Sequence, residues 1–329
     1  MEHNSKTQNK PYQIQVTGDL PYYVPFPEEA ILTPSLIGAE PFRLQLQHFV
    51  LKPSEEGMQV SGDDRLGTFI RSRIIFEYKS LEGPSEFNQA VLQKALEITN
   101  RFIDAVKYST SDFSMRPIQQ FDHYIISYSQ EGTAEILKEG TTFGPFGITP
   151  IARMTSEKVQ SVYCLFNGIV SINSSRMLLL DAKYHSTIGD YNRAVLDIGT
   201  ALETHIGWLI NQYKTVFPEF YEISTDDKNC WEHYDEVLLA ATGHTMREEE
   251  DLFVQLEFIR AIRNSVTHEW RPIFSMGPKF RTQYESRHRL RDGTEINTKE
   301  KADELIQSAQ KILDYAEELF RLKYENKSP

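Results

Sequence analysis

The sequence predicts an α+β protein in which a mixed α/β domain is followed by an all-α helical bundle. Two observations predict this order: β-branched and aromatic runs between prolines before about Ser80, and apolar residues at helical spacing through most of the chain after Met154. We expect a disordered tail at residues 1–11, the α/β domain at 12–153 and the helical domain at 154–329. With 329 residues, the chain is long enough for each domain to bury its own core.

The N-terminal domain is expected to combine a sheet with one long helix. Strands are predicted at Leu44–Leu51, Thr68–Tyr78 and His123–Ser129, and the second is rich in β-branched and aromatic residues. From Ser85, a residue type that caps helices, apolar residues recur every three or four positions as far as Val106. This spacing predicts a long amphipathic helix.

The C-terminal domain is predicted to be a helical bundle. A hairpin is expected from helices at Ser175–Ile188 and Tyr191–Tyr213, joined by a tight turn at Gly189 and Asp190 in which Asp190 is the N-cap. A helix over Glu249–Asn264 and a final helix capped by Thr298 complete the bundle. Shorter helices are expected at Glu157–Phe166 and Trp231–Ala241.

Composition is typical of a globular protein that remains in the cytoplasm. No apolar run is long enough to span a bilayer, and the N-terminal residues are polar where a signal peptide needs an apolar run, so no membrane association is expected. The two cysteines, Cys164 and Cys230, suit a reducing compartment and lack the spacing of metal ligands. Zinc-binding and glycine-rich phosphate-binding motifs do not occur, so neither a metal nor a cofactor is expected.

The charge balance restricts how the protein can contact nucleic acid. The formal net charge of -12 argues against a broad, sequence-blind nucleic-acid binder, because such proteins gain most of their affinity by neutralising phosphates. One segment with few acids is basic enough for a local RNA contact, although a solvated loop would explain it equally well. Its predicted RNA-binding residues are Lys279, Arg281, Arg287 and Arg289.

A short polar motif overlaps the end of the helix predicted at Glu249–Asn264. It consists of Arg263, Asn264 and, five positions after the arginine, His268. An arginine followed by a histidine at similar spacing occurs elsewhere in the chain, so the spacing alone is not diagnostic. The context is more specific, because an amphipathic helix leads into the motif, an asparagine follows the arginine directly and Pro272 closes the segment.

This motif resembles the signature of the HEPN superfamily, in which an arginine and a polar residue precede a histidine by a short spacer. The hairpin upstream, including the triplet Ala201-Leu202-Glu203, is similar to the first two helices of many members, and the resemblance covers residues 174–325. It implies a metal-independent endoribonuclease that acts as a toxin or an antiphage defence effector. It also implies a homodimer formed through the HEPN domain, and RNA products with 2′,3′-cyclic phosphate and 5′-hydroxyl ends.

The residue types of the motif suit that chemistry. In cleavage without a metal, the ribose 2′-hydroxyl attacks the adjacent phosphorus, so a base must accept its proton and an acid must protonate the leaving 5′-oxygen. His268 can do either near neutral pH, and Arg263 can stabilise the negative charge on the phosphate oxygens. Asn264 would orient the histidine or hold a phosphate oxygen, and Glu203 would accept a hydrogen bond from Arg263.

The spacing of the motif imposes a geometric condition. Residues five apart in an ideal helix lie about 140° apart around the axis, because each residue turns about 100°. Arg263 and His268 then cannot both face one phosphate from a straight helix. We therefore expect the helix to bend or end between them, where the β-branched residues Val266 and Thr267 lie.

Alternatives to these interpretations remain open. Arg263 and His268 could form a buried polar pair, and Asn264 could be a helix C-cap. The domain as a whole could be a non-catalytic HEPN-like scaffold that binds a nucleotide or a partner. The N-terminal domain could recognise an inhibitor, an activating partner or RNA. Three of its aromatic residues could form a partner-binding ridge or pack beneath a loop: Tyr22, Tyr23 and Phe26.

Overall fold

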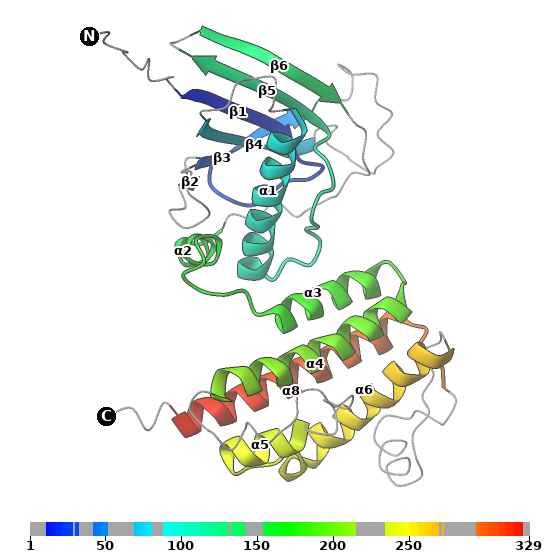
Figure 1. Cartoon of the computed structure of the whole chain (residues 1–329). Coiled ribbons are helices and arrows are strands. Elements are labelled where there is room, and N and C mark those ends of the chain that lie inside the picture. Colours follow the sequence, from blue (N-terminus) through cyan, green and yellow to red (C-terminus); the bar gives the residue numbers. More distant parts are fainter. Residues whose placement is uncertain are drawn as a thin grey trace, which may run out of the picture. The chain divides into compact units, whose positions relative to one another are not determined.

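A computed structural model describes residues 11–28, 30–32, 42–51, 69–80, 88–130, 133–141, 154–214, 234–269, 272 and 294–324 of the protein. The chain divides into two compact units, Met1–Ile172 and Asn173–Pro329 (Figure 1). Over the described residues the first unit contains both strands and helices, whereas every regular element of the second is a helix. The mixed α+β fold predicted from the sequence is confirmed at this level.

The first unit is built around a six-stranded antiparallel sheet with the strand order β2-β3-β4-β1-β5-β6. The strands are β1 (Tyr12–Asp19), β2 (Ile31–Leu32), β3 (Phe42–Leu51), β4 (Phe69–Ser80), β5 (His123–Gln130) and β6 (Thr133–Thr141). Because β1 pairs with β4 on one side and with β5 on the other, Val16 lies opposite both Phe76 and Ile126. Side chains of directly opposed residues point to the same face, so these three apolar residues share one face of the sheet.

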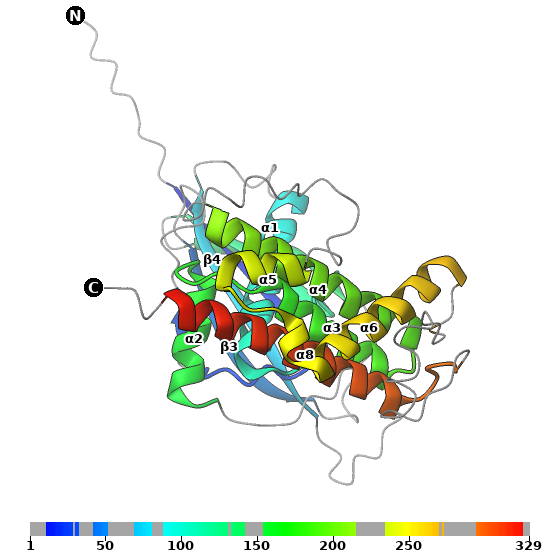
Figure 2. The same ribbon diagram turned by 90° about the horizontal axis from the view of Figure 1, so that it is seen from below.

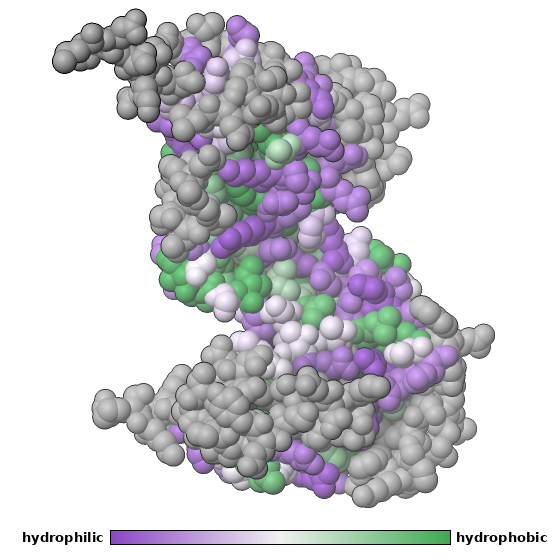
Figure 3. Space-filling model, viewed as in Figure 1, coloured by the Kyte–Doolittle hydropathy of each residue, from purple (hydrophilic) through white to green (hydrophobic). Residues whose placement is uncertain are grey.

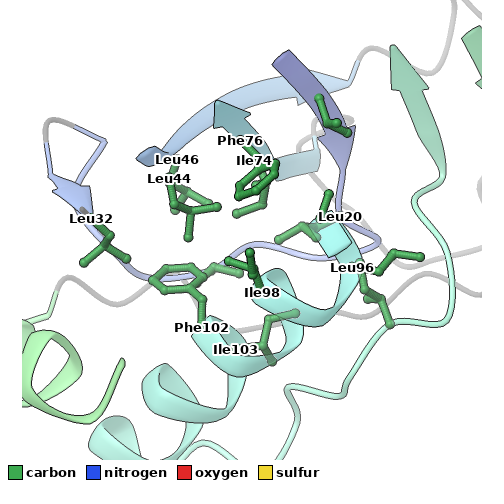
Figure 4. Packing of buried hydrophobic residues seen from close by; sticks show 14 of the residues in the cluster. Leu20, Leu32, Leu44, Leu46, Ile74, Phe76, Leu96, Ile98, Phe102 and Ile103 are labelled. Atoms are coloured by element: carbon green, nitrogen blue, oxygen red, sulfur yellow. The ribbon is translucent and has the colours of Figure 1, made fainter. Parts of the chain in front are cut away.

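That face packs against α1 (Asn88–Thr110) and forms the core of the unit (Figure 4). The sheet contributes Leu44, Leu46, Ile74 and Phe76, and α1 contributes Leu96, Ile98, Phe102 and Ile103. Apolar residues recur along α1 at spacings of three and four, which gathers them on the side that faces the sheet. The ring of Phe102 lies 5.1 Å from the ring of Phe26 between centroids, in an edge-to-face arrangement.

The elements predicted for this unit correspond to β3, β4, β5 and α1. The proposed cap Ser85 lies outside the described residues, and so does the tail predicted at 1–11 except for Pro11. Tyr22 and Phe26 are buried members of the core, so packing, and not an exposed ridge, is their role. Tyr23 is partly buried and its ring packs against His48 at 4.6 Å between centroids.

The boundary between the two units lies later than the one predicted between residues 153 and 154. Helix α2 (Ser156–Phe166) forms where a helix was expected, but it belongs to the first unit. Its buried residues Val162, Leu165 and Phe166 join the core made by the sheet and α1. The prediction is therefore wrong for residues 154–172, because helical spacing identifies α2 without revealing the core on which it packs.

The second unit is a bundle of helices around one apolar core (Figure 2). Its elements are α3 (Ser174–Thr187), α4 (Tyr191–Lys214), α5 (Tyr234–Thr242), the 3-10 helix η3 (Met246–Glu248), α6 (Glu250–Glu269) and α8 (Lys299–Tyr324). Helix α4 is central, because it contacts α3, α5, α6 and α8. Buried residues from facing helices, such as Ile198, Ile262 and Ile312, fill the space between them.

Two predicted caps are confirmed in this unit. Gly189 adopts a left-handed φ of 81°, which allows the tight turn between α3 and α4. The Asp190 carboxylate then accepts a hydrogen bond from the backbone N–H of Arg193 at 3.1 Å. At the start of α8, the hydroxyl oxygen of Thr298 accepts from the backbone N–H of Lys301 at 3.3 Å.

Large apolar residues on the described surface are scattered over several elements. Those with high exposure are Ile31, Ile169, Val170, Ile188, Trp208, Leu239 and Leu322. Figure 3 shows hydrophobic residues interspersed with hydrophilic ones on one face of the molecule. In the part of the chain that the structure describes, no helix combines the length and the apolar character needed to cross a membrane.

Candidate functional site

The motif residues Arg263, Asn264 and His268 all lie in the C-terminal half of α6. The buried side of α6 carries apolar residues at helical spacing, Val254, Phe258, Ile262 and Val266. These residues pack into the core of the bundle and fix how α6 is rotated about its axis. The rotation decides which motif residues face α4 and which face solvent.

Helix α6 continues from Glu250 to Glu269 and ends one residue after His268. We expected a bend or an end between Arg263 and His268, and of these two alternatives the helix end is wrong. Val266 is buried within the helix, and the hydroxyl of Thr267 donates to the carbonyl oxygen of Arg263 at 3.0 Å. A β-branched residue costs about 0.5 kcal/mol in a helix, whereas burial of a valine side chain contributes about 1.5–3 kcal/mol, so packing outweighs local propensity here.

Arg263 is held by two residues of α4. Its Nη2 atom lies 2.9 Å from Oε1 of Glu203, and the two side chains are 27% and 29% exposed. Its aliphatic part crosses Gly199, where an added Cβ would lie only 2.6 Å from Cγ of Arg263. The absence of a side chain at Gly199 thus makes room for the arginine between α4 and α6. The contact predicted between Glu203 and Arg263 is confirmed.

This arrangement orients the guanidinium and leaves it partly accessible. An arginine has five N–H donors in a rigid plane, and the ion pair with Glu203 engages the Nη2 end of Arg263. The remaining donors lie in a side chain that is still 27% exposed, so they can reach an anion from solvent. A phosphate is the anion whose geometry a guanidinium fork matches best, together with a carboxylate.

Replacing Gly199 by alanine is expected to displace Arg263 and destabilise the helical unit by about 1–3 kcal/mol, as overpacked substitutions do. Gly207 lies on the same helix with nothing within 4 Å of an added Cβ, so Gly207→Ala is the matched control. That control should be neutral or stabilising by about 0.5–1 kcal/mol, because alanine favours a helix over glycine. Urea unfolding of both variants measures the difference, and equal stabilities would contradict the close packing of Arg263 on Gly199.

Asn264 and His268 share the solvent-exposed side of α6. They are four residues apart and lie about 40° apart around the axis, one above the other. Within the described part of the chain, neither side chain makes a hydrogen bond or ion pair. Helix α6 extends five residues beyond Asn264, so the alternative role of this asparagine as a C-cap is wrong. Both side chains remain available to a ligand.

Arg263 and His268 do not come together within one chain. The guanidinium is directed toward Glu203 on α4, and His268 lies about 140° farther around α6, where it is exposed. The alternative of a buried Arg263–His268 pair is therefore wrong. Neither residue is sealed in the core, so both are open to an interaction outside their own chain.

The predicted RNA-binding residues cannot be placed relative to this site, because Lys279, Arg281, Arg287 and Arg289 lie outside the described residues. Sequence reasoning missed Gly199, although an isolated glycine within an apolar helical repeat is itself a signal of close packing. Among the described residues, no three His, Cys, Asp or Glu side chains are grouped so that they could hold a metal ion.

Comparisons with protein-family models, with curated proteins and with solved structures find no match for this chain.

Proposed function

We propose that this protein is a metal-independent endoribonuclease of the HEPN type, with Arg263, Asn264 and His268 as its reacting residues. The observation that carries the proposal is the environment of Arg263. Its aliphatic part lies on Gly199, and its guanidinium is oriented by Glu203 while the side chain stays partly exposed. The exposed residues Asn264 and His268 lie on the same helix. An oriented cation and an imidazole are the groups that phosphodiester cleavage needs.

Each residue takes a separate role in the proposed reaction. His268 exchanges protons with the attacking 2′-hydroxyl or the leaving 5′-oxygen, because an imidazole can act as a general acid or base and this one is exposed to solvent. Arg263 donates hydrogen bonds to the non-bridging oxygens as they gain charge in the transition state. Asn264 lies one turn from His268 and orients its ring or binds a phosphate oxygen. The products carry 2′,3′-cyclic phosphate and 5′-hydroxyl ends.

The divergence of Arg263 and His268 favours a site built from two copies of the chain. A two-fold axis beside the exposed side of α6 would set His268 of each copy against Arg263 of the other. The resemblance to HEPN proteins implies the same homodimer. The proposal therefore assigns a dimer-dependent activity to the helical unit.

The biological setting follows from the same resemblance. The activity of a toxin or antiphage effector that cleaves RNA must be regulated. We assign recognition of an inhibitor or activating partner to the N-terminal unit. The basic segment at residues 279–291 is the proposed local RNA contact of a chain with a net charge of -12.

The test is cleavage of structured RNA in the presence of EDTA. The wild-type protein is expected to cleave RNA in chelator, and His268→Ala is expected to lower the rate about 10²–10⁴-fold, because proton transfer contributes that much. His244→Ala is the matched control, since His244 is an exposed histidine of the same unit that pairs with Glu248 at 2.8 Å. Loss of activity in EDTA, or equal rates for the two variants, would contradict the proposal. A protein that binds but never cleaves RNA would instead be a non-catalytic scaffold.

A further inference from the structure

A buried histidine lies where α4, α5 and α8 meet in the second unit. His205 of α4 is 0% exposed, and its Nδ1 atom lies 2.9 Å from the hydroxyl oxygen of Tyr234, the first residue of α5. Tyr234 is also 0% exposed, and Trp208 stacks on the imidazole at 5.8 Å between ring centroids. Histidine changes its charge in the mildly acidic range, so its complete burial makes this junction sensitive to pH.

The other edge of the imidazole faces charged groups that are already paired. Nε2 of His205 lies 3.3 Å from Oε1 of Glu317 on α8, without the geometry of a hydrogen bond. Arg176 of α3 donates to Glu317 at 2.8 Å and pairs with Asp314 at 2.7 Å, and Asn173 donates to Glu317 at 3.5 Å. One cation and two carboxylates therefore surround His205 from α3 and α8.

The contact with Tyr234 depends on a neutral imidazole. Burial raises the pKa of Tyr234 far above its ordinary value, so the phenol keeps its proton and needs an acceptor for it. A neutral histidine offers one ring nitrogen as an acceptor, whereas both nitrogens are donors once the ring is protonated. Protonation would leave the Tyr234 hydroxyl proton without its His205 acceptor inside the core, which costs about 1–3 kcal/mol.

We propose that His205 is an acid-sensitive latch, whose protonation breaks the hydrogen bond to Tyr234 and loosens the attachment of α5 to α4 and α8. Burial lowers the pKa of His205, and the opposing effect of the Glu317 carboxylate is smaller. An unfolded chain has a histidine pKa of about 6.5, so the stabilisation is complete above about pH 6.5 and is lost as the pH falls toward the lower pKa of the folded state. The latch is independent of the proposed nuclease.

Amide hydrogen exchange of the full-length protein at pH 7 and pH 5, corrected for intrinsic rates, tests the latch. In the wild type, protection of α5 (Tyr234–Thr242) is expected to fall roughly ten-fold at the lower pH, while protection of β1 and β4 in the first unit stays constant. In His205→Asn, the amide oxygen replaces Nδ1 as acceptor of the Tyr234 hydrogen bond and does not titrate. Helix α5 should therefore keep the same protection at pH 7 and pH 5. His244→Asn removes an exposed histidine and should behave as the wild type.

Two outcomes of the exchange experiment would overturn the latch. One is a wild type in which α5 is equally protected at both pH values, and the other is a His205→Asn variant that loses protection as the wild type does. An NMR titration of the histidine ring signals in the unmodified protein gives a readout that does not require the variant to fold. A His205 pKa at or above about 6.5 in that titration would also overturn the proposal.

Discussion

Replacing Arg263 by alanine is expected to lower the rate of RNA cleavage about 10²–10³-fold, the loss seen when one preorganised donor to a developing negative charge is removed. The structure explains why the effect should fall on the rate of the chemical step. Arg263 is oriented by Glu203 and Gly199 within the chain itself, so in the proposed reaction its donors are already in place when the phosphate oxygens gain charge. Initial rates at saturating RNA, with helicity checked by circular dichroism, measure the change.

Arg260 offers a matched control on the same helix. It lies one turn before Arg263 and its Nη1 is 3.7 Å from Glu257, so Arg260→Ala removes an equal charge from α6. That variant should keep a rate close to the wild type. If Arg260→Ala and Arg263→Ala lose activity equally, the effect comes from general charge at α6 and the assigned role of Arg263 is wrong.

Mixing two inactive variants tests whether the site is shared between copies. A mixed dimer of Arg263→Ala and His268→Ala chains has one site with both substitutions and one site with neither, provided that arginine and histidine come from different copies. Random exchange makes half of the dimers mixed, so about a quarter of the wild-type activity should return. A site formed within one chain would stay inactive after mixing, and scattering that shows only monomers would contradict the dimer directly.

The local sequence pattern predicted where helices and strands form, but it predicted less well how these elements pack together. The apolar repeats of α4 and α8 identify both helices, and Asp190 and Thr298 mark their starts. Strand β1 was not singled out, because its outward face is polar and Ile14 and Val16 are its only fully buried large apolar residues. Helix α2 was recognised as a helix and assigned to the wrong unit, since an apolar stripe does not specify the surface that covers it.

The candidate site shows the same division between local and tertiary information. Residue types and their sequence context indicated Arg263, Asn264 and His268, and the contact with Glu203 followed from the helical hairpin. The continuity of α6 through His268 was not foreseen, because the β-branched residues before it argued locally for a helix end, while burial of Val266 within the bundle favours the helix. Such burial depends on α4 and α8, which are distant in the sequence.

In the first unit, Asp122→Ala is expected to destabilise the fold by about 3–5 kcal/mol, the cost of breaking a buried ion pair by removing one partner. Arg71 of β4 and Asp122, which precedes β5, form this pair, with side chains only 7% and 11% exposed. Arg71 also donates from Nε to the carbonyl oxygen of Leu20 at 2.9 Å, so its position is fixed and it cannot move out to solvent easily. Removal of the carboxylate therefore takes away the ion-pair partner of a buried cation.

Glu139→Ala is the matched control for this prediction. Glu139 lies on the neighbouring edge strand β6, is 58% exposed and contacts His123 at 3.0 Å. Its loss should change stability by less than about 1 kcal/mol, because solvent screens an exposed pair. Urea unfolding, followed through hydrogen exchange in β1 and β4 so that the first unit is observed separately, measures both variants. Equal effects of the two substitutions would show that burial of the ion pair does not determine how much stability its loss removes.

A double substitution separates the cost of removing one charge of the buried pair from the contribution of the pair itself. Replacing both partners, as in Arg71→Leu with Asp122→Leu, removes the two charges together and leaves apolar groups of comparable size. Replacement of a buried ion pair by apolar residues is often neutral or stabilising, so the double variant should recover most of the stability lost in Asp122→Ala. If it is instead as unstable as the single variant, the hydrogen bond from Arg71 to Leu20, and not the charge balance, is what joins β4 to the segment after β1.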